Sequence, residues 1–298
     1  MEILPIRLIA FDLDGTILNS KKEVEPATRA ALLEAAARGV VVLPATGRAL
    51  GNIPEPILTL PGLQYAITSN GAALWQLGSD PIAAARSRWR TAAGAEASLP
   101  AGGRLLSVAD LPAAKAAEVF VRLRAFMPGE LKVFVSGRTV EEPDSHRWSI
   151  AHPGGFLPPP ELPVVVGDVP AYLAAHDGGI EKICMFFRDM DTLHAARAVL
   201  DATAGIEVVQ GAPDNLEVTA PGIDKGVGLR ALCGLLDIPP AQALAMGDSE
   251  NDLGMLRAAG AAGVMANGTA QAKAAATYIA AADCDHGGAA EIIRHYLR

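Results

Sequence analysis

The feature that most constrains this chain is a short apolar segment that ends in two carboxylates. Residues 8–11 are entirely apolar, which is typical of a strand buried on both faces of a parallel sheet. Asp12 and Asp14 follow directly, with Gly15 and Thr16 after them. Since residues i and i+2 of an extended chain point to the same side, the two carboxylates can converge just past the strand. The pattern predicts an acidic site, although an ordinary turn can also place Asp before Gly.

Two carboxylates this close repel each other unless a cation lies between them or one of them holds a proton. Hard oxygen ligands at this spacing suit Mg²⁺. In open α/β sheets, ligands bind beyond the carboxyl ends of the strands. Asp12 and Asp14 are therefore candidates for catalysis and for metal binding at such an edge.

The composition indicates a folded, acidic protein of about two domains. The chain has 298 residues, of which 50% are hydrophobic, so it can bury a large core and disorder is not expected. Its net charge of −8 argues against binding to nucleic acid or to an anionic membrane. Cys184, Cys233 and Cys284 are too scattered for a disulfide framework or a zinc site. With no signal peptide and no apolar stretch long enough to cross a bilayer, we expect a cytoplasmic protein.

Three further apolar strand patterns also end in small polar or charged residues. They cover residues 40–43, 65–68 and 243–246. The residues that follow them are Thr46-Gly47-Arg48, Ser69-Asn70-Gly71 and Gly247-Asp248-Ser249-Glu250-Asn251-Asp252. A helix pattern that starts at Pro26 separates the first two strands, which predicts a βαβ unit. Lys225 begins another helix pattern, which Asp224 is expected to cap. All these strand ends are therefore expected to line one rim.

The middle of the chain has a different pattern. Residues 78–104 are rich in Ala, Gly and Pro, and residues 153–163 are rich in proline. Asp110 is expected to cap a helix that runs to about Met127. Strand patterns and helix patterns here do not alternate strictly, which favours an α+β layer with an antiparallel sheet. We expect an inserted domain, with the boundaries 1–80 for the first part of the core, 81–217 for the insertion and 218–298 for the second part of the core.

The four polar segments, in order, resemble the four motifs of the haloacid dehalogenase (HAD) superfamily of phosphatases. They are Asp12-Leu13-Asp14-Gly15-Thr16, Thr46-Gly47-Arg48, Lys225 within Gly222-Ile223-Asp224-Lys225-Gly226, and Gly247-Asp248-x-x-Asn251-Asp252. Ser69-Asn70-Gly71-Ala72 and Asp285-His286-Gly287-Gly288-Ala289 are similar to the Cof-type subfamily, which has a large C2B cap. The resemblance covers residues 6–76 and 216–292, and the middle matches in pattern only. It implies a Rossmann-like, doubly wound parallel-sheet core with an inserted α+β cap domain.

The sequence differs from the usual family motifs in two places. Asp224 stands where the family usually has Ser before the lysine, and it is still a competent helix cap. Residues 263–268 rearrange a Met-Gly-Asn-Ala stretch of the family. Neither change touches the proposed chemistry.

The resemblance also implies a mechanism that hydrolyses small phosphomonoesters. Asp12 would attack phosphorus and form an aspartyl-phosphate. Asp14 would protonate the leaving alkoxide and later deprotonate water, so it must carry a proton in the first step. Mg²⁺ would bind Asp12, the main-chain carbonyl of Asp14, and Asp248, with Asp252 supporting the metal site through water or Lys225.

The remaining motif residues would bind the phosphoryl group. They are Thr46 with adjacent backbone N–H groups such as that of Gly47, Lys225 and Asn251. Thr46 and Lys225 could also serve only as a cap and an exposed helix-start lysine. Arg48 could form a structural ion pair or approach the phosphate, and Asn70 could be a turn residue or lie near the site.

The leaving group would be selected by the inserted domain, where no residue has a strong enough signal to be named as a site. The candidates are Arg138, Asp144, His146, Trp148 and Arg188. His286 in the matched tail is expected to be structural. Two other functions stay open. One is a phosphosugar mutase, although mutases of this type generally have a longer fourth motif. The other is a non-catalytic sensor of a phosphorylated ligand, which the loss of Asp12 or Asp14 would have indicated, but both are present. The expected partner is a small phosphomonoester, bound by a monomer or homodimer.

Overall fold

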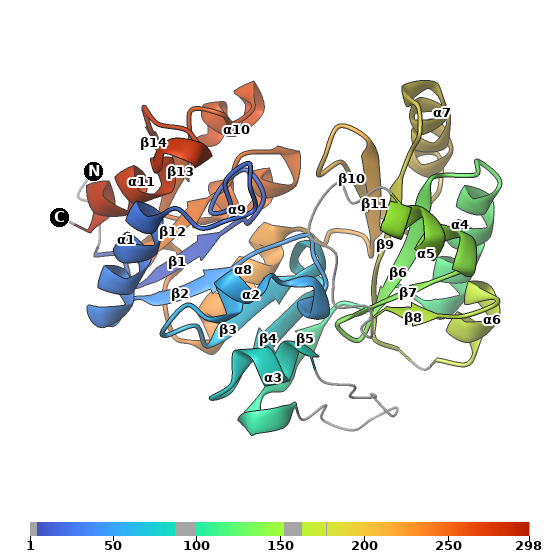
Figure 1. The fold of residues 1–298 in the computed structure, drawn as a ribbon, viewed down its shortest axis with the longest axis horizontal. Helices are drawn as coiled ribbons and strands as arrows, with labels where there is room; N and C mark the ends of the chain where they lie inside the picture. Colours follow the sequence, from blue (N-terminus) through green and yellow to red (C-terminus); the bar gives the residue numbers. More distant parts are fainter. Residues whose placement is uncertain (1–4, 87–98, 152–162, 177, 298) are drawn as a thin grey trace.

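The acidic strand ends belong to a five-stranded parallel sheet. A computed structural model describes residues 5–86, 99–151, 163–176 and 178–297 (Figure 1). The order of the strands is β14-β13-β12-β1-β2, and every neighbouring pair is parallel. The strands are β1 (Leu8–Phe11), β2 (Val41–Pro44), β12 (Ala243–Met246), β13 (Ala261–Val264) and β14 (Tyr278–Ile279). The predicted parallel core sheet is confirmed.

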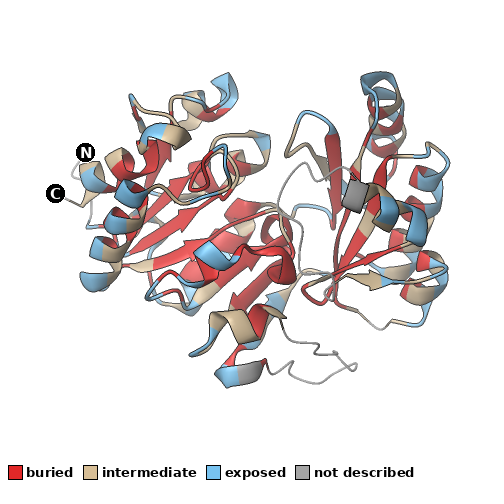
Figure 2. Ribbon diagram, in the orientation of Figure 1, coloured by how far each residue is buried: buried red, intermediate tan, exposed pale blue. Residues whose placement is uncertain are grey.

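Helices cover both faces of this sheet, as the fully apolar β1 requires (Figure 2). One face packs on α1 (Pro26–Ala37) and α11 (Gly288–Tyr296), and the other on α8 (Lys225–Leu235), α9 (Leu253–Ala258) and α10 (Ala270–Ala275). Alternate residues of β1 point to opposite faces, so Ile9 and Phe11 lie in one core, whereas Leu8 and Ala10 lie in the other. The sheet is thus doubly wound.

The strand predicted at residues 65–68 lies beside this sheet but is not one of its strands. It forms β3 (Tyr65–Thr68) of a separate antiparallel sheet with β4 (Ala73–Gln76) and β5 (Arg104–Val108). A single parallel bridge, Ala45 to Ile67, joins β3 to the residue that follows β2. Ser69 and Asn70 have positive φ angles, which turn the chain sharply into β4. The polar end of β3 nevertheless stays beside that of β2.

The inserted layer is a six-stranded mixed sheet in the order β10-β11-β9-β6-β7-β8. Only the β7–β8 pair is parallel. The strands are β6 (Glu130–Val135), β7 (Arg138–Glu141), β8 (Val164–Val165), β9 (Ile180–Phe186), β10 (Glu207–Val209) and β11 (Asn215–Thr219). The predicted α+β insertion is confirmed, and we call these strands and their helices the cap.

One face of the cap sheet is apolar and carries three helices. They are α4 (Ala113–Arg124), α6 (Val169–Ala174) and α7 (Met190–Asp201), and they lie on the side away from the core sheet (Figure 1). The other face carries charged and aromatic side chains, and α5 (Pro143–Ala151) contacts β6 there through Ser149, which donates a hydrogen bond to Glu130. The polar face of the cap sheet is the one that meets the core.

Short helices complete the described chain. They are η1 (Leu50–Asn52), α2 (Glu55–Leu58), η2 (Ser69–Gly71), α3 (Pro81–Arg86), η3 (Pro100–Gly102), η4 (Pro240–Gln242), η5 (Glu250–Asp252) and η6 (Cys284–His286). Within the described ranges, no helix is both long and apolar enough to cross a membrane.

One expected helix cap is wrong. The Asp110 carboxylate accepts a hydrogen bond from the backbone N–H of Gly179, at 2.7 Å, and does not cap α4, whose N-cap is Pro112. A non-local partner therefore replaces the local one. Most of the proline-rich segment at residues 153–163 lies outside the described residues. The domain boundaries 1–80, 81–217 and 218–298 stay a prediction.

Candidate active site

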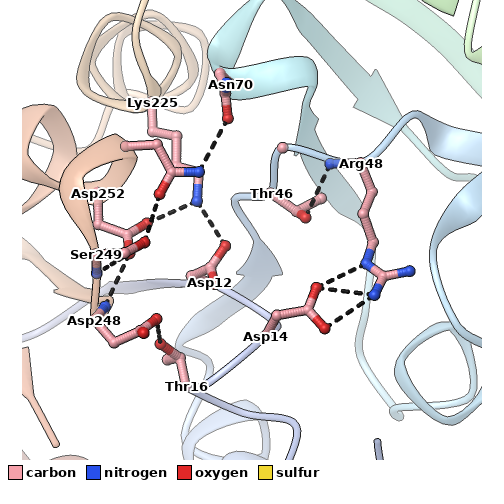
Figure 3. A network of polar contacts seen from close by, with 12 residues as sticks. Asp12, Asp14, Thr16, Thr46, Arg48, Asn70, Lys225, Asp248, Ser249 and Asp252 are labelled. Carbon is pink, nitrogen blue, oxygen red and sulfur yellow. Dashed lines mark hydrogen bonds and ion pairs between the residues drawn. The ribbon is translucent and has the colours of Figure 1, made fainter. Parts of the chain in front are cut away.

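Strand register brings three polar strand ends together. Phe11, the last residue of β1, lies opposite Met246 of β12 and Pro44 of β2. The backbone N–H of Asp12 donates to the carbonyl of Met246 at 2.9 Å. Because the three parallel strands end at the same level, Asp12, Asp248 and Thr46 follow them onto one rim (Figure 3).

At the centre of the rim, a buried lysine joins two carboxylates. The Nζ of Lys225 donates to Asp12 at 2.6 Å and to Asp252 at 2.7 Å, and the side chains of Lys225 and Asp252 have no exposed surface (Figure 3). Burial opposes the charge of Lys225, but Asp12 and Asp252 outweigh burial and raise the pKa of the lysine. Asp224 caps α8 by accepting from the N–H of Val227 at 2.7 Å, which fixes Lys225 at the start of the helix. Lys225 is thus a permanent buried cation.

The acidic turn after β12 is held mainly by Asp252. One oxygen of Asp252 accepts from Lys225, and the other accepts from the backbone N–H groups of Asp248 and Ser249, at 2.8 and 3.0 Å. Gly247 is required beside it, since a Cβ there would lie 2.4 Å from the Asp252 carboxyl carbon. Asp248 also accepts from the Thr16 hydroxyl at 3.1 Å. Asp252 therefore shapes the turn that presents Asp248.

The donor set at the rim fits a hard divalent cation. Among the described residues, carboxylate oxygens of Asp12, Asp248 and Asp252 lie within 4.8 Å of one another. Burial raises the pKa of Asp12 well above its usual value against the opposing effect of Lys225, and the neighbouring carboxylates raise it further. Burial and Asp252 raise the pKa of Asp248 to about 7. Carboxyl groups that resist ionisation because they are crowded can all ionise around a bound cation.

The Asp14 carboxylate has different neighbours. It accepts two hydrogen bonds from the Arg48 guanidinium, both at 2.9 Å (Figure 3). It accepts a third from Lys22 at 2.8 Å. Burial alone would raise the pKa of Asp14, but Arg48 and Lys22 outweigh burial and hold this pKa below its usual value. Of the two alternatives for Arg48, the structure contains the ion pair. The predicted roles of Asp14 as an acid and as a main-chain metal ligand stay predictions.

Thr46, Gly47, Asn70 and Asn251 lie close together, and we call them the phosphate rim after the phosphate-binding role that the sequence predicts for most of them. The Thr46 hydroxyl accepts from the N–H of Arg48 at 3.1 Å, the local cap that was the structural alternative, and it still has its own hydrogen to donate. The N–H of Asn70 donates to the carbonyl of Thr46 at 3.1 Å. The Asn251 amide nitrogen lies 3.4 Å from the Asn70 side-chain oxygen. Two chain segments far apart in sequence thus meet here.

The cap side chains that reach this rim are ones the sequence analysis did not single out. They are Lys182 of β9 and Glu217 of β11, which contact Gly47 and Asn70. A signal for them was present, because each is a charged residue next to aliphatic residues within a strand. The cap candidate His146 instead pairs with Glu141 within the cap, at 2.7 Å.

Two other side chains considered earlier also have local partners. Asp144 pairs with Arg147 on the exposed face of α5. His286 pairs with Asp283 at 2.6 Å at the surface, in keeping with a structural role.

Known proteins are similar in sequence to this chain over nearly its whole length. The family of haloacid dehalogenase-like hydrolases matches residues 9–86 and 172–293. The chain is 30% identical to the HMP-PP phosphatase of Cronobacter sakazakii, with 98% of this chain and 96% of the relative covered. It is 25% identical to the 5-amino-6-(5-phospho-D-ribitylamino)uracil phosphatase YcsE of Bacillus subtilis, with 99% and 98% covered.

Solved structures share its fold. A haloacid dehalogenase-like hydrolase from B. subtilis has a TM-score of 0.77 at 24% identity and covers 97% of this chain and 99% of its own. A HAD subclass IIB sugar phosphatase has a TM-score of 0.73 at 19% identity, with 97% and 98% covered. The match in sequence spans both parts of the core, and the match in fold includes the cap. The chain therefore belongs to the haloacid dehalogenase-like hydrolases and is a phosphatase of that family.

Proposed function

We propose that this phosphatase hydrolyses small phosphomonoesters, sugar phosphates or related metabolites, in a Mg²⁺-dependent reaction through an aspartyl-phosphate on Asp12. The observation that carries the proposal is the buried contact of Lys225 with Asp12 and Asp252. It fixes the orientation of a carboxylate at the end of β1 and keeps a positive charge beside it. Both are what a carboxylate nucleophile needs when it approaches a phosphate dianion.

In the first step Asp12 attacks phosphorus and the alkoxide of the substrate leaves. Lys225 offsets the negative charge that the phosphoryl group brings next to Asp12. Thr46, the backbone N–H of Gly47, and Asn251 offer hydrogen-bond donors to the phosphoryl oxygens. Asp12, Asp248 and the main-chain carbonyl of Asp14 would hold Mg²⁺, with Asp252 in support, and the bound ion supplies Lewis-acid stabilisation of phosphoryl charge.

Asp14 is the proposed acid and base. Arg48 and Lys22 favour its unprotonated form, which suits the second step, in which it takes a proton from the attacking water. The first step needs the protonated form. A phosphate dianion bound at the rim brings negative charge near Asp14 and competes for Arg48, and both effects raise the pKa of Asp14. Substrate binding would therefore help to protonate the acid.

The substrate class rests on the relatives. Their names are those of phosphatases that act on HMP-PP, on a phosphoribitylamino-uracil, and on sugar phosphates. The shared feature is a small phosphorylated metabolite, and the individual substrate is left to experiment. A cytoplasmic location and a monomeric or homodimeric state also stay predictions.

The test is phosphate release from a panel of sugar, nucleotide and cofactor phosphates, with Mg²⁺ and with EDTA. Metal-dependent release by the wild type, abolished in Asp12→Asn, is expected. Isomerised sugar phosphate without free phosphate would instead identify a mutase. Binding without turnover of any ester, including an aryl phosphate, would identify a sensor.

A further inference from the structure

A buried ion pair of the cap, Lys182 with Glu217, contacts the phosphate rim. Lys182 and Glu217 lie on neighbouring antiparallel strands, and the Nζ of Lys182 is 2.6 Å from a Glu217 carboxylate oxygen. Their side chains are 1% and 7% exposed. The Nζ of Lys182 also lies over the ring of Phe134, 4.7 Å from its centroid. Both charges are therefore almost entirely removed from water.

Each member of the pair also contacts the core. The Nζ of Lys182 donates to the main-chain carbonyl of Gly47. The second carboxylate oxygen of Glu217 accepts from the Asn70 amide at 2.5 Å. The site is so tight that a Cβ on Gly47 would lie 2.9 Å from the Asn70 oxygen, 3.3 Å from Glu217 and 3.4 Å from Lys182. The pair thus holds one peptide and one side chain of the phosphate rim.

These contacts continue to Asn251. Because Glu217 accepts from the Asn70 nitrogen, the Asn70 oxygen is directed to the Asn251 nitrogen, 3.4 Å away. The Asn251 oxygen accepts from the Ser249 hydroxyl at 2.8 Å. The Lys182–Glu217 pair therefore contacts Gly47 and Asn70 directly and Asn251 through Asn70, three of the four residues of the phosphate rim.

Neither stability nor attraction of phosphate accounts for this pair. A buried ion pair is generally no more stabilising than well-packed apolar residues of the same size, because both charges lose their hydration. Burial would raise the pKa of Glu217, but Lys182 and the Asn70 hydrogen bond outweigh burial and lower it, so the carboxylate is ionised. An ionised Glu beside a Lys brings no net charge to attract an anion. What remains is the placement of the groups they hold.

We infer that Lys182 and Glu217 are positioning residues through which the docked cap completes the phosphate rim, an inference that rests on the proposed phosphatase function. They fix the direction of the Gly47 peptide and of the Asn70 amide, and through Asn70 that of Asn251. The cap, besides selecting the leaving group, then contributes to binding the phosphoryl group that all substrates share. Phosphate affinity and cap docking are coupled.

The test replaces both charges with apolar residues of similar size, Lys182→Met with Glu217→Leu. Inorganic phosphate is the probe, titrated calorimetrically into the Mg²⁺-loaded protein, because it has no leaving group. The melting temperature is expected to stay near that of the wild type, since no unpaired charge is left. The dissociation constant for phosphate is expected to rise about tenfold or more, from the loss of two charge-assisted hydrogen bonds.

A matched control exists on the same face of the same sheet. Glu130 and Lys132 of β6 form a second pair, at 2.5 Å, with side chains 9% and 15% exposed, and its described contacts lie within the cap. Glu130→Leu with Lys132→Met should leave phosphate affinity unchanged. An equal loss of affinity in this control would overturn the inference, because any damage to the cap would then suffice.

A conservative variant tests the Glu217 contact alone, at the cost in stability that an unpaired Lys182 brings. Glu217→Gln keeps the shape and an oxygen that can accept from Asn70, so it is expected to keep most of the phosphate affinity. Wild-type affinity in the Met/Leu variant, or a full loss in Glu217→Gln, would overturn the inference. Wild-type protein that binds phosphate but releases none from any ester would refute the proposed function alone, and the comparison of variants would stand.

Discussion

Replacing Lys225 by methionine should cost far more stability than replacing an exposed lysine. Lys225 lies without exposed surface between Asp12 and Asp252, at 2.6 and 2.7 Å. The substitution leaves two buried carboxylates without their common cation. Removing one partner of a buried ion pair costs about 3–5 kcal/mol, and we expect a loss in that range for the free energy of unfolding at pH 7.

The assay is urea unfolding followed by far-UV circular dichroism, with EDTA present so that no metal ion replaces the lost charge. The matched control is Lys115→Met, which removes a partly exposed lysine paired with Glu118 on α4 and should cost less than about 1 kcal/mol. The pH dependence tests the cause. Burial already raises the pKa of Asp12, so lowering the pH to 5 protonates more of this carboxyl and should shrink the deficit of Lys225→Met.

Two results would refute this reasoning. One is a loss below about 1 kcal/mol, the size expected of an exposed pair. The other is a deficit of the same size at pH 5 and pH 8, which would mean that lost packing and not unpaired charge is the cause. Adding Asp252→Asn to Lys225→Met should recover part of the loss, since one unpaired carboxylate is then neutral.

Three further predictions follow from other parts of the site. Arg48→Met removes the guanidinium that lowers the pKa of Asp14, so the acidic limb of the pH–rate profile should move to higher pH; an unmoved limb would exclude Asp14 as the titrating group. Burial raises the pKa of Glu181, which accepts from Ser69 and from the N–H of Gly137, to about 7. The folded-state pKa of Glu181 lies above the unfolded value of 4.5, so the folded protein favours the protonated side chain. The protein is therefore most stable, with respect to this group, below pH 4.5, and it loses stability as the pH rises through about 7. Glu181→Gln should therefore stabilise the protein more at pH 8 than at pH 4.5 in denaturant titrations, and a gain independent of pH would contradict this. Mg²⁺ should raise the melting temperature of the wild type, by an amount equivalent to about 2.7 kcal/mol at one hundred times its dissociation constant. The rise should be much smaller in Asp248→Asn, and equal rises in both proteins would place the metal elsewhere.

The sequence was sufficient for the parts of the site that sheet pairing determines. Buried parallel strands have to be apolar, and their carboxyl ends have to share an edge, so the sequence alone predicts that Asp12, Asp248 and Thr46 lie together. The cap of α8 by Asp224 was equally predictable, because a cap depends on residues three positions apart.

The parts that could not be predicted depend on non-local side-chain contacts. Asp110 lies close enough to α4 in sequence to cap this helix, but its carboxylate instead accepts from the N–H of Gly179, 69 residues away. The pairing of Asp14 with Lys22 and Arg48 depends on side-chain directions that spacing does not define. Lys182 and Glu217 meet only because of the register between β9 and β11. Charged residues within these strand patterns were visible in the sequence, but their partners were not.

The strand order has a consequence for how this protein is synthesised. β1 lies between β2 and β12, so β1 keeps one edge unpaired during synthesis until β12, far later in the chain, has emerged. Asp12 likewise waits for Lys225, 213 residues later. At about 5–20 residues per second this takes on the order of ten seconds or more, during which an apolar strand edge is open to mispairing. The cap lies within one continuous stretch of chain and can fold during that interval, which shortens the effective loop between the two halves of the core.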